Sequence, residues 1–209
     1  MKIVWFVFVL VAVLVGVYPL AYIITDMSGG LLSTKPPELL NDQVWRLAFY
    51  CHILPGGMAL LAGWSQFITT FRNKYLSLHR WLGRVYVSAV LISGSAGLYL
   101  AWFATGGMIS ILGFGMLALL WLITTGRAYQ LIRTGRSAQH QQWMIRSYAL
   151  CFAAVTLRLW LPFLDNSIGL DFFVAYRLVA WLCWVPNLMV GELMVWNLRS
   201  GSHTVNARA

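Results

Sequence analysis

Two short stretches of the chain place a histidine close to tryptophan, arginine and tyrosine, directly before an apolar run. The first covers residues 78–86 (LHRWLGRVY) and the second covers residues 140–148 (HQQWMIRSY). A neutral imidazole is a good ligand for iron, copper and zinc. On a helix, His79, Gly83 and Tyr86 would share one face, and the glycine would leave a recess beside the histidine.

A porphyrin requires such clearance, an imidazole on each face of its iron, and cations near its propionates. His79 and His140 would supply the two axial ligands, and Arg80, Arg84 and Arg146 would lie near the propionates. The pattern therefore raises the hypothesis of one b-type haem between the two stretches. The alternative is that both histidines are interfacial residues that hydrogen-bond to loop backbone.

The composition indicates the compartment in which this chemistry would take place. Of the 209 residues, 60% are hydrophobic and 10% are charged, whereas soluble domains have about 25% charged residues. The chain is therefore expected to be an integral membrane protein with one membrane domain, residues 1–198. Cys51, Cys151 and Cys183 lie inside apolar runs, so they are expected to be small buried hydrophobes and not disulfide partners.

Six apolar stretches are long enough to cross about 30 Å of hydrocarbon as helices. The first is too long for a usual signal peptide, and no clear cleavage site follows it. We expect an all-α, six-helix transmembrane bundle with kinks at Pro55 and Pro186 and a disordered cytoplasmic tail at residues 199–209. The expected spans are residues 3–25, 44–70, 81–103, 109–126, 143–163 and 172–197.

Charges are distributed unequally between the two sides of these spans. Eleven of the fifteen Lys and Arg residues fall on one side and five of the six acids on the other. Since basic loops stay in the cytoplasm, both termini are predicted to be cytoplasmic, in the inner membrane of a bacterium. The net charge of +9 is spread between the spans, so it does not indicate nucleic-acid binding. The eleven basic residues are Lys2, Arg72, Lys74, Arg80, Arg84, Arg127, Arg133, Arg136, Arg146, Arg199 and Arg208.

Four ionisable side chains inside the expected spans are further functional candidates, because such groups are costly in a membrane. In one hypothesis they line a polar path through which a haem-free transporter moves a small solute or protons, between the two proline kinks. In the other they are structural, with the arginines paired to Asp165 and Asp171 and the glutamate paired to a cation. A third alternative is a structural or assembly partner of a larger membrane complex. The four residues are His52, Arg158, Arg177 and Glu192.

Residues 79–84 (HRWLGR) resemble the His-Arg-x-x-Gly-Arg entry to the third span of ferric-reductase-like transmembrane domains. In that family, histidines on spans three and five ligate haems, so the resemblance implies that His79 and His140 ligate an inner haem. The family's second histidines are replaced here, which limits the expectation to one haem. Without a flavin or nicotinamide domain, electrons would come from a quinone or a redox partner protein. The replaced positions are Ile92 or Ser93 and Ala153 or Ala154.

Over nearly its whole length the chain resembles the bacterial membrane family DUF2306. The resemblance rests on residues 79–86, 143–150, 156–158 and 181–187. It implies a multi-pass membrane architecture and no particular activity. The chain contains no Walker, HExxH or GxSxG motif and no GxGxxG after a strand, so the sequence leaves open whether the protein is an enzyme.

Overall fold

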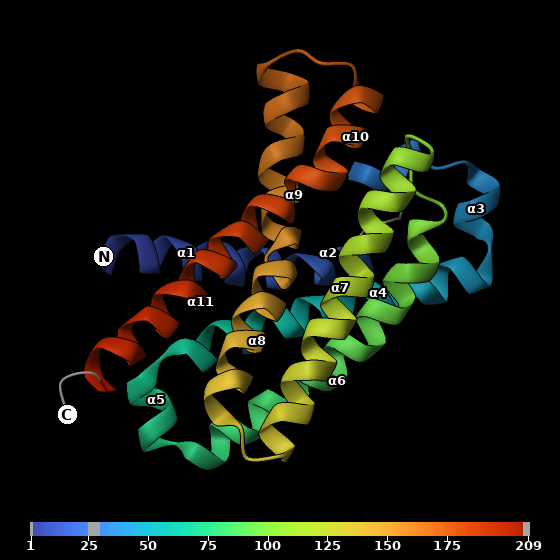
Figure 1. The fold of residues 1–209 in the computed structure, drawn as a ribbon. Coiled ribbons are helices and arrows are strands. Elements are labelled where there is room, and N and C mark those ends of the chain that lie inside the picture. Colours follow the sequence, from blue (N-terminus) through green and yellow to red (C-terminus); the bar gives the residue numbers. More distant parts are fainter. Residues whose placement is uncertain (1, 25–29, 207–209) are drawn as a thin grey trace.

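The computed structural model describes residues 2–24 and 30–206, and the regular structure within them is entirely helical (Figure 1). Six helical segments are long and apolar enough to cross a membrane, which confirms the predicted six-helix architecture. They cover Lys2–Ile24, Gln43–Phe67, Leu76–Ala101, Met108–Arg133, Ser137–Ser167 and Phe172–Ser200. Thr25, Asp26 and Arg208, which enter the predictions above, lie outside the described residues.

Several spans consist of more than one helix. The first half of the chain contains α1 (Lys2–Val17), η1 (Tyr18–Leu20), α2 (Ala21–Ile24), η2 (Gly30–Thr34), α3 (Pro37–Asn41), α4 (Gln43–Gly63), η3 (Trp64–Phe67), α5 (Thr69–Lys74) and α6 (Leu76–Ala101). The second half contains α7 (Met108–Arg133), α8 (Ser137–Cys151), α9 (Ala153–Pro162), the π-helical turn η4 (Phe163–Ser167), α10 (Phe172–Leu182) and α11 (Val185–Asn206).

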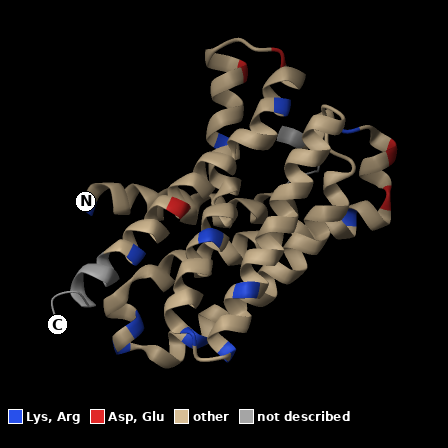
Figure 2. Ribbon diagram, viewed as in Figure 1, with Lys and Arg blue, Asp and Glu red and all other residues tan. Residues whose placement is uncertain are grey.

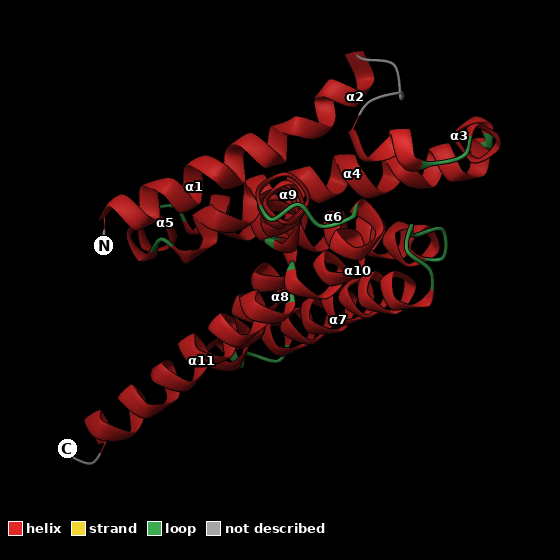
Figure 3. Cartoon of the chain, turned by 90° about the horizontal axis from the view of Figure 1, so that it is seen from above, coloured by secondary structure: helices red, strands yellow, loops and turns green. Residues whose placement is uncertain are grey.

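Small residues allow the central helices to approach closely. α4 packs most extensively against α6, and α6 buries three small residues spaced four apart, Ala89, Ser93 and Gly97. A Cβ atom added to Gly97 would come within 3.0 Å of the His52 ring. Viewed from above, α1 and α7 lie on opposite sides of the molecule, with α4, α6 and α9 between them (Figure 3). α4 and α6 can therefore approach closely where α6 carries these small residues.

Two predicted boundaries differ from the structure in a way that matters for the histidines. α6 begins at Leu76 and not at residue 81, and α8 begins at Ser137 and not at residue 143. The polar first turns extend each helix beyond its apolar part, so hydropathy alone does not mark them. His79 and His140 therefore lie on helices. α11 continues to Asn206 and so extends into residues 199–209, the segment that was expected to form a disordered tail.

The fifth and sixth spans are interrupted near their middles. α8 and α9 meet at Phe152, and α10 and α11 are separated by Cys183 and Trp184, just before Pro186. In contrast, Pro55 lies inside an uninterrupted α4. The two interrupted spans lie side by side through contacts of α10 with α9 and of α11 with α8.

The charges separate along the bundle. Figure 2 shows acidic positions mainly at the end that holds α3 and the α9–α10 connection, which we call the α3 end. Basic positions are frequent at the opposite end, which holds α5 and the α7–α8 connection and which we call the α5 end. The separation matches the charge pattern of the sequence, while the side that faces the cytoplasm stays a prediction.

Candidate functional site

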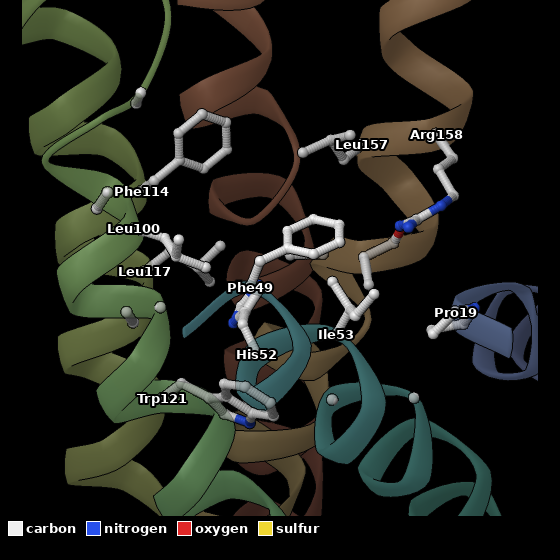
Figure 4. Close-up of a pocket in the computed structure, with 18 of the residues that line it drawn as sticks. Pro19, Phe49, His52, Ile53, Leu100, Phe114, Leu117, Trp121, Leu157 and Arg158 are labelled. Atoms are coloured by element: carbon white, nitrogen blue, oxygen red, sulfur yellow. The ribbon is translucent and has the colours of Figure 1, made fainter. Parts of the chain in front are cut away.

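A cavity of about 280 Å³ lies at the centre of the bundle, and all six spans contribute to its wall. The wall is mainly apolar and rich in aromatic side chains, among them Phe49, Phe114, Trp121 and Tyr176. Figure 4 shows His52 and Arg158 bordering the same space from different helices. The cavity thus combines an apolar interior with a small number of polar groups, as ligand sites in proteins usually do.

His52 of α4 is held by α6 in a fixed orientation. Its Nδ1 lies 2.9 Å from the carbonyl oxygen of Ser93, and the Ser93 hydroxyl donates to the His52 carbonyl over 2.7 Å. With Nδ1–H donating to that carbonyl, the neutral ring keeps Nε2 as a hydrogen-bond acceptor. His52 therefore brings a neutral acceptor to the cavity wall.

Arg158 of α9 brings a positive charge to the same cavity. Its Nη1 donates to the carbonyl oxygen of Ala154 over 2.7 Å, and its guanidinium lies 5.0 Å from the centre of the Tyr18 ring. Within residues 2–24 and 30–206, the ion pair that forms is between Arg146 and Glu192, and none involves Arg158.

The predicted pairing of Arg158 and Arg177 with Asp165 and Asp171 is therefore wrong. The Asp171 carboxylate instead accepts hydrogen bonds from the backbone N–H groups at the start of α10, where a carboxylate satisfies otherwise unpaired donors.

Lys35, in the connection between η2 and α3, completes the polar part of the wall. Its Nζ donates to the carbonyl oxygen of Phe103 over 2.5 Å and to the hydroxyl of Thr105 over 2.9 Å. Burial lowers the pKa of the Lys35 ammonium. Lys35 was not among the predicted site residues, although it is the one basic residue in an otherwise acidic connection, residues 26–42.

Arg177 and Glu192, the other two residues of the predicted polar path, lie outside this cavity wall. Arg177 Nε donates to the carbonyl oxygen of Gly106 over 2.8 Å and so ties α10 to the α6–α7 turn. Glu192 accepts two hydrogen bonds from Arg146, at 2.5 and 2.8 Å. The structure thus brings together two of the four predicted residues, His52 and Arg158.

The second candidate site is formed by His79 of α6 and His140 of α8, which lie close enough to interact electrostatically. His140 Nδ1 lies 2.9 Å from the carbonyl oxygen of Ala128, which leaves Nε2 as a potential metal ligand. His79 Nδ1 is buried without a hydrogen-bond partner. In the part of the chain that the structure describes, no group of three or more His, Cys, Asp or Glu side chains could hold a metal ion.

The arginines expected beside these histidines are not arranged alike. Arg146 is engaged by Glu192 and also stacks at 4.8 Å on the Trp143 ring. Arg80 and Arg84 are exposed, and Arg84 Nε lies 3.4 Å from the Arg80 carbonyl oxygen. Two of the three predicted partners for propionates are therefore without an acidic partner among the described residues.

The two His-containing stretches do meet in the structure, through residues other than the histidines. Tyr86 Oη lies 2.7 Å from Ser147 Oγ, which lies 2.6 Å from Thr125 Oγ1, and Trp121 Nε1 donates to Tyr86 Oη over 3.4 Å. Tyr86 and Ser147 each follow the histidine of their stretch by seven residues, a spacing that returns to the same helix face. The hydroxyls of this buried network were not among the predicted site residues, although the shared seven-residue spacing is a signal by which they could have been found.

The family model for predicted membrane proteins called DUF2306 matches residues 49–195, well over half of the chain. The chain belongs to this family. The DUF2306 region includes His52, Arg158, both His-containing stretches and the interruptions of the fifth and sixth spans, whereas Tyr22 and Lys35 of the cavity wall precede it. No curated protein and no solved structure matches the chain.

Proposed function

We propose that this DUF2306 protein is a haem-free membrane transporter that binds a small solute in the central cavity. The observation that carries the proposal is that His52 and Arg158, on different spans, line one cavity walled by all six spans. Ionisable residues inside a membrane usually face a cavity or pathway for a solute or ion. A purely structural role would not require the two side chains to share a cavity.

The interrupted helices support the proposal. Phe152 lies between Cys151 and Ala153, which both line the cavity. At the other interruption, the hydroxyl of Thr156 and the amide of Asn187 both donate to the Cys183 carbonyl oxygen, at 2.5 and 2.9 Å. In many transporters, discontinuous helices form the substrate site, and rigid parts of the bundle move around it.

The sidedness that we propose places both termini in the cytoplasm and the protein in a bacterial inner membrane. It is supported by the basic character of the α5 end and the acidic character of the α3 end (Figure 2). In this orientation Lys35 faces the outer side of the membrane.

Uptake by liposomes that contain the purified protein tests the proposal. We expect saturable uptake of at least one of benzoate, benzamide and benzamidine, three probes of similar size and different charge. Ala154→Trp, which fills the cavity, should abolish it, whereas the control Leu159→Trp, on the exposed face of the same helix, should not. Absence of saturable uptake for all three probes, or uptake unchanged by Ala154→Trp, would contradict the proposal.

A second candidate function is electron transfer through one b-type haem held by His79 and His140. It is favoured by the unpartnered His79 Nδ1 and by the His140 hydrogen bond to Ala128, which is the type of contact that orients a metal-bound imidazole. Beside His79 there is also room, since a Cβ atom on Gly83 would meet only Gln66 Oε1, at 4.0 Å. The Arg146 ion pair fits less well, because a propionate would compete with Glu192.

Optical absorption separates the two candidates. After expression with ample haem, the haem hypothesis expects a Soret band that disappears in a His79→Ala, His140→Ala double variant. Protein without such a band, or with a band that the double variant retains, would exclude this assignment. Neither result affects solute uptake through the central cavity.

A further inference from the structure

We infer that the central cavity accepts a small hydrophobic monoanion, a carboxylate with a compact apolar body, and that Arg158 binds its carboxylate. The inference rests on the proposed function and assigns the substrate class of the same cavity. Four observations carry it: the sign of the charges in the wall, the unpaired state of Arg158, the free donors of its guanidinium, and the volume of the cavity.

The charges of the cavity wall all have one sign. Lys35 and Arg158 are cationic, and the described wall contains no Asp or Glu. An unpaired charge inside a bilayer is costly, and proteins normally pair it or expose it to water. A bound anion would supply the counter-charge that the chain itself does not provide for Arg158.

The two cations are not equivalent as ligands for an anion. Lys35 already donates to Phe103 and Thr105 at the edge of the cavity, which uses two of its three N–H donors. Arg158 donates from one Nη1 to its own helix, at Ala154. A guanidinium has five N–H donors arranged as a fork that matches a carboxylate, so Arg158 is the residue suited to bind it with two parallel hydrogen bonds.

The remainder of the cavity sets the shape of the ligand. Aromatic and aliphatic side chains line it, including Phe49, Phe114 and Leu117 (Figure 4). Its volume of about 280 Å³ is slightly below the range of about 300 to 1,000 Å³ that is usual for ligand sites. The ligand body is therefore a single ring or a short branched chain, and a long acyl chain is too large. His52, with its neutral acceptor nitrogen, adds polarity without a second full charge.

Calorimetric titration of the purified protein with benzoate, benzamide and benzamidine tests the inference, because the three probes differ in charge at nearly constant shape. We expect benzoate to bind at least about tenfold more tightly than benzamide, and benzamidine to bind most weakly. Arg158→Gln should weaken benzoate by about 30-fold or more, as expected for the loss of one partner of a desolvated charge pair, and should change benzamide less than about threefold. Arg46→Gln removes an exposed arginine from the same end of the bundle and should leave all three affinities unchanged.

Each outcome separates this inference from the proposed function. Equal binding of benzoate and benzamide, or tightest binding of benzamidine, would overturn the anion assignment while leaving a solute-binding cavity. No binding and no uptake of any probe would overturn both. Arg158→Lys keeps the charge and should keep the preference for benzoate over benzamide at reduced affinity. Comparison of benzoate, benzamide and benzamidine binding to the unmodified protein tests the preference for an anion even where a variant does not fold.

Discussion

At the scale of single residues, Arg158 and Arg146 are two arginines of the fifth span with different surroundings. Arg146 has its charge balanced by Glu192 in a two-fold hydrogen-bonded ion pair. Arg158 has an aromatic ring and a carbonyl oxygen as neighbours, and its charge is not balanced by any described carboxylate. Since an unbalanced charge in a membrane lowers stability, Arg158 is better explained by a ligand than by the fold.

This difference predicts opposite effects of two equivalent substitutions on stability without ligand. Arg158→Gln should leave the Tm unchanged or raise it, because it removes an unpaired charge. Arg146→Gln should lower the free energy of unfolding by about 1 kcal/mol, a modest value because half of the Glu192 side chain is exposed. Thermal unfolding of both variants in the same detergent measures the effect. A Tm of Arg158→Gln that falls as much as that of Arg146→Gln would assign Arg158 a structural role.

Lys35 predicts a pH dependence. Because burial lowers the pKa of Lys35 in the folded protein, the unfolded chain binds more protons than the folded protein between that lowered pKa and the usual value of about 10.4. The free energy of unfolding therefore rises with pH in this window. In Lys35→Met this contribution is absent, so the Tm of the unmodified protein minus that of the variant should increase from neutral pH towards pH 10. A constant difference over that range would contradict the burial of the ammonium.

The Tyr86–Ser147 contact predicts a coupling between the two His-containing stretches. Tyr86→Phe and Ser147→Ala each remove one hydroxyl of the buried network. A double-mutant cycle should give a coupling free energy of about 0.6–2 kcal/mol, the range measured for hydrogen bonds between membrane helices. Additive effects of the two substitutions would mean that this hydrogen bond contributes nothing to joining α6 and α8.

At the scale of elements, the interruptions in the fifth and sixth spans are the features that set this bundle apart from six simple helices. Pro186 lacks an N–H, so the turn before it loses a helical hydrogen bond, and the break falls at Cys183 and Trp184. Thr156 of α9 and Asn187 of α11 then satisfy the Cys183 carbonyl. The break is thus stabilised by side chains, as irregular backbone inside a membrane must be.

Asn187→Leu should therefore destabilise the protein. It removes the donors to the Cys183 carbonyl, at 2.9 Å, and to the Thr156 hydroxyl, at 3.0 Å. The expected loss in the free energy of unfolding is about 1–3 kcal/mol, the cost of leaving buried polar groups unsatisfied. Asn197→Leu, an exposed position on the same helix, is the matched control and should have little effect. Equal stability of the two variants would show that the break does not depend on Asn187.

The elements were predictable to different degrees. Six spans follow directly from runs of apolar residues. The start of α6 at Leu76 and of α8 at Ser137 did not follow, because polar turns at a membrane surface carry no hydropathy signal. The interruption at Phe152 was not predicted, because no proline lies near it in the sequence.

The site was predictable only in part. His52 and Arg158 were predicted as site residues because they are ionisable and lie inside expected spans. The structure places both at one cavity. Arg177 and Glu192 are also ionisable residues inside a span, yet they contact other neighbours, Gly106 at the α6–α7 turn and Arg146 of α8. The ionisable character of a residue does not show which neighbouring helix its side chain faces. The Lys35 contact with Phe103 joins positions 68 residues apart, and no local pattern encodes it.

At the scale of the whole molecule, the orientation in the membrane remains a prediction that follows from charge. In a background without the three cysteines, Ser137→Cys lies at the α5 end and Ser167→Cys at the α3 end. With cytoplasmic termini, a membrane-impermeant thiol reagent added to intact cells should label Ser167→Cys and not Ser137→Cys. The reverse pattern would place both termini outside.

The central claim is that a small hydrophobic carboxylate occupies the cavity between His52 and Arg158. Crystals of the protein grown with 4-bromobenzoate test it most directly, because bromine gives an anomalous signal that locates the ligand without assumptions about affinity or uptake. We expect one bromine peak inside the cavity walled by all six spans, with the carboxylate at Arg158. Bromine peaks confined to the outer surface of the helices, with none in the cavity, would contradict it.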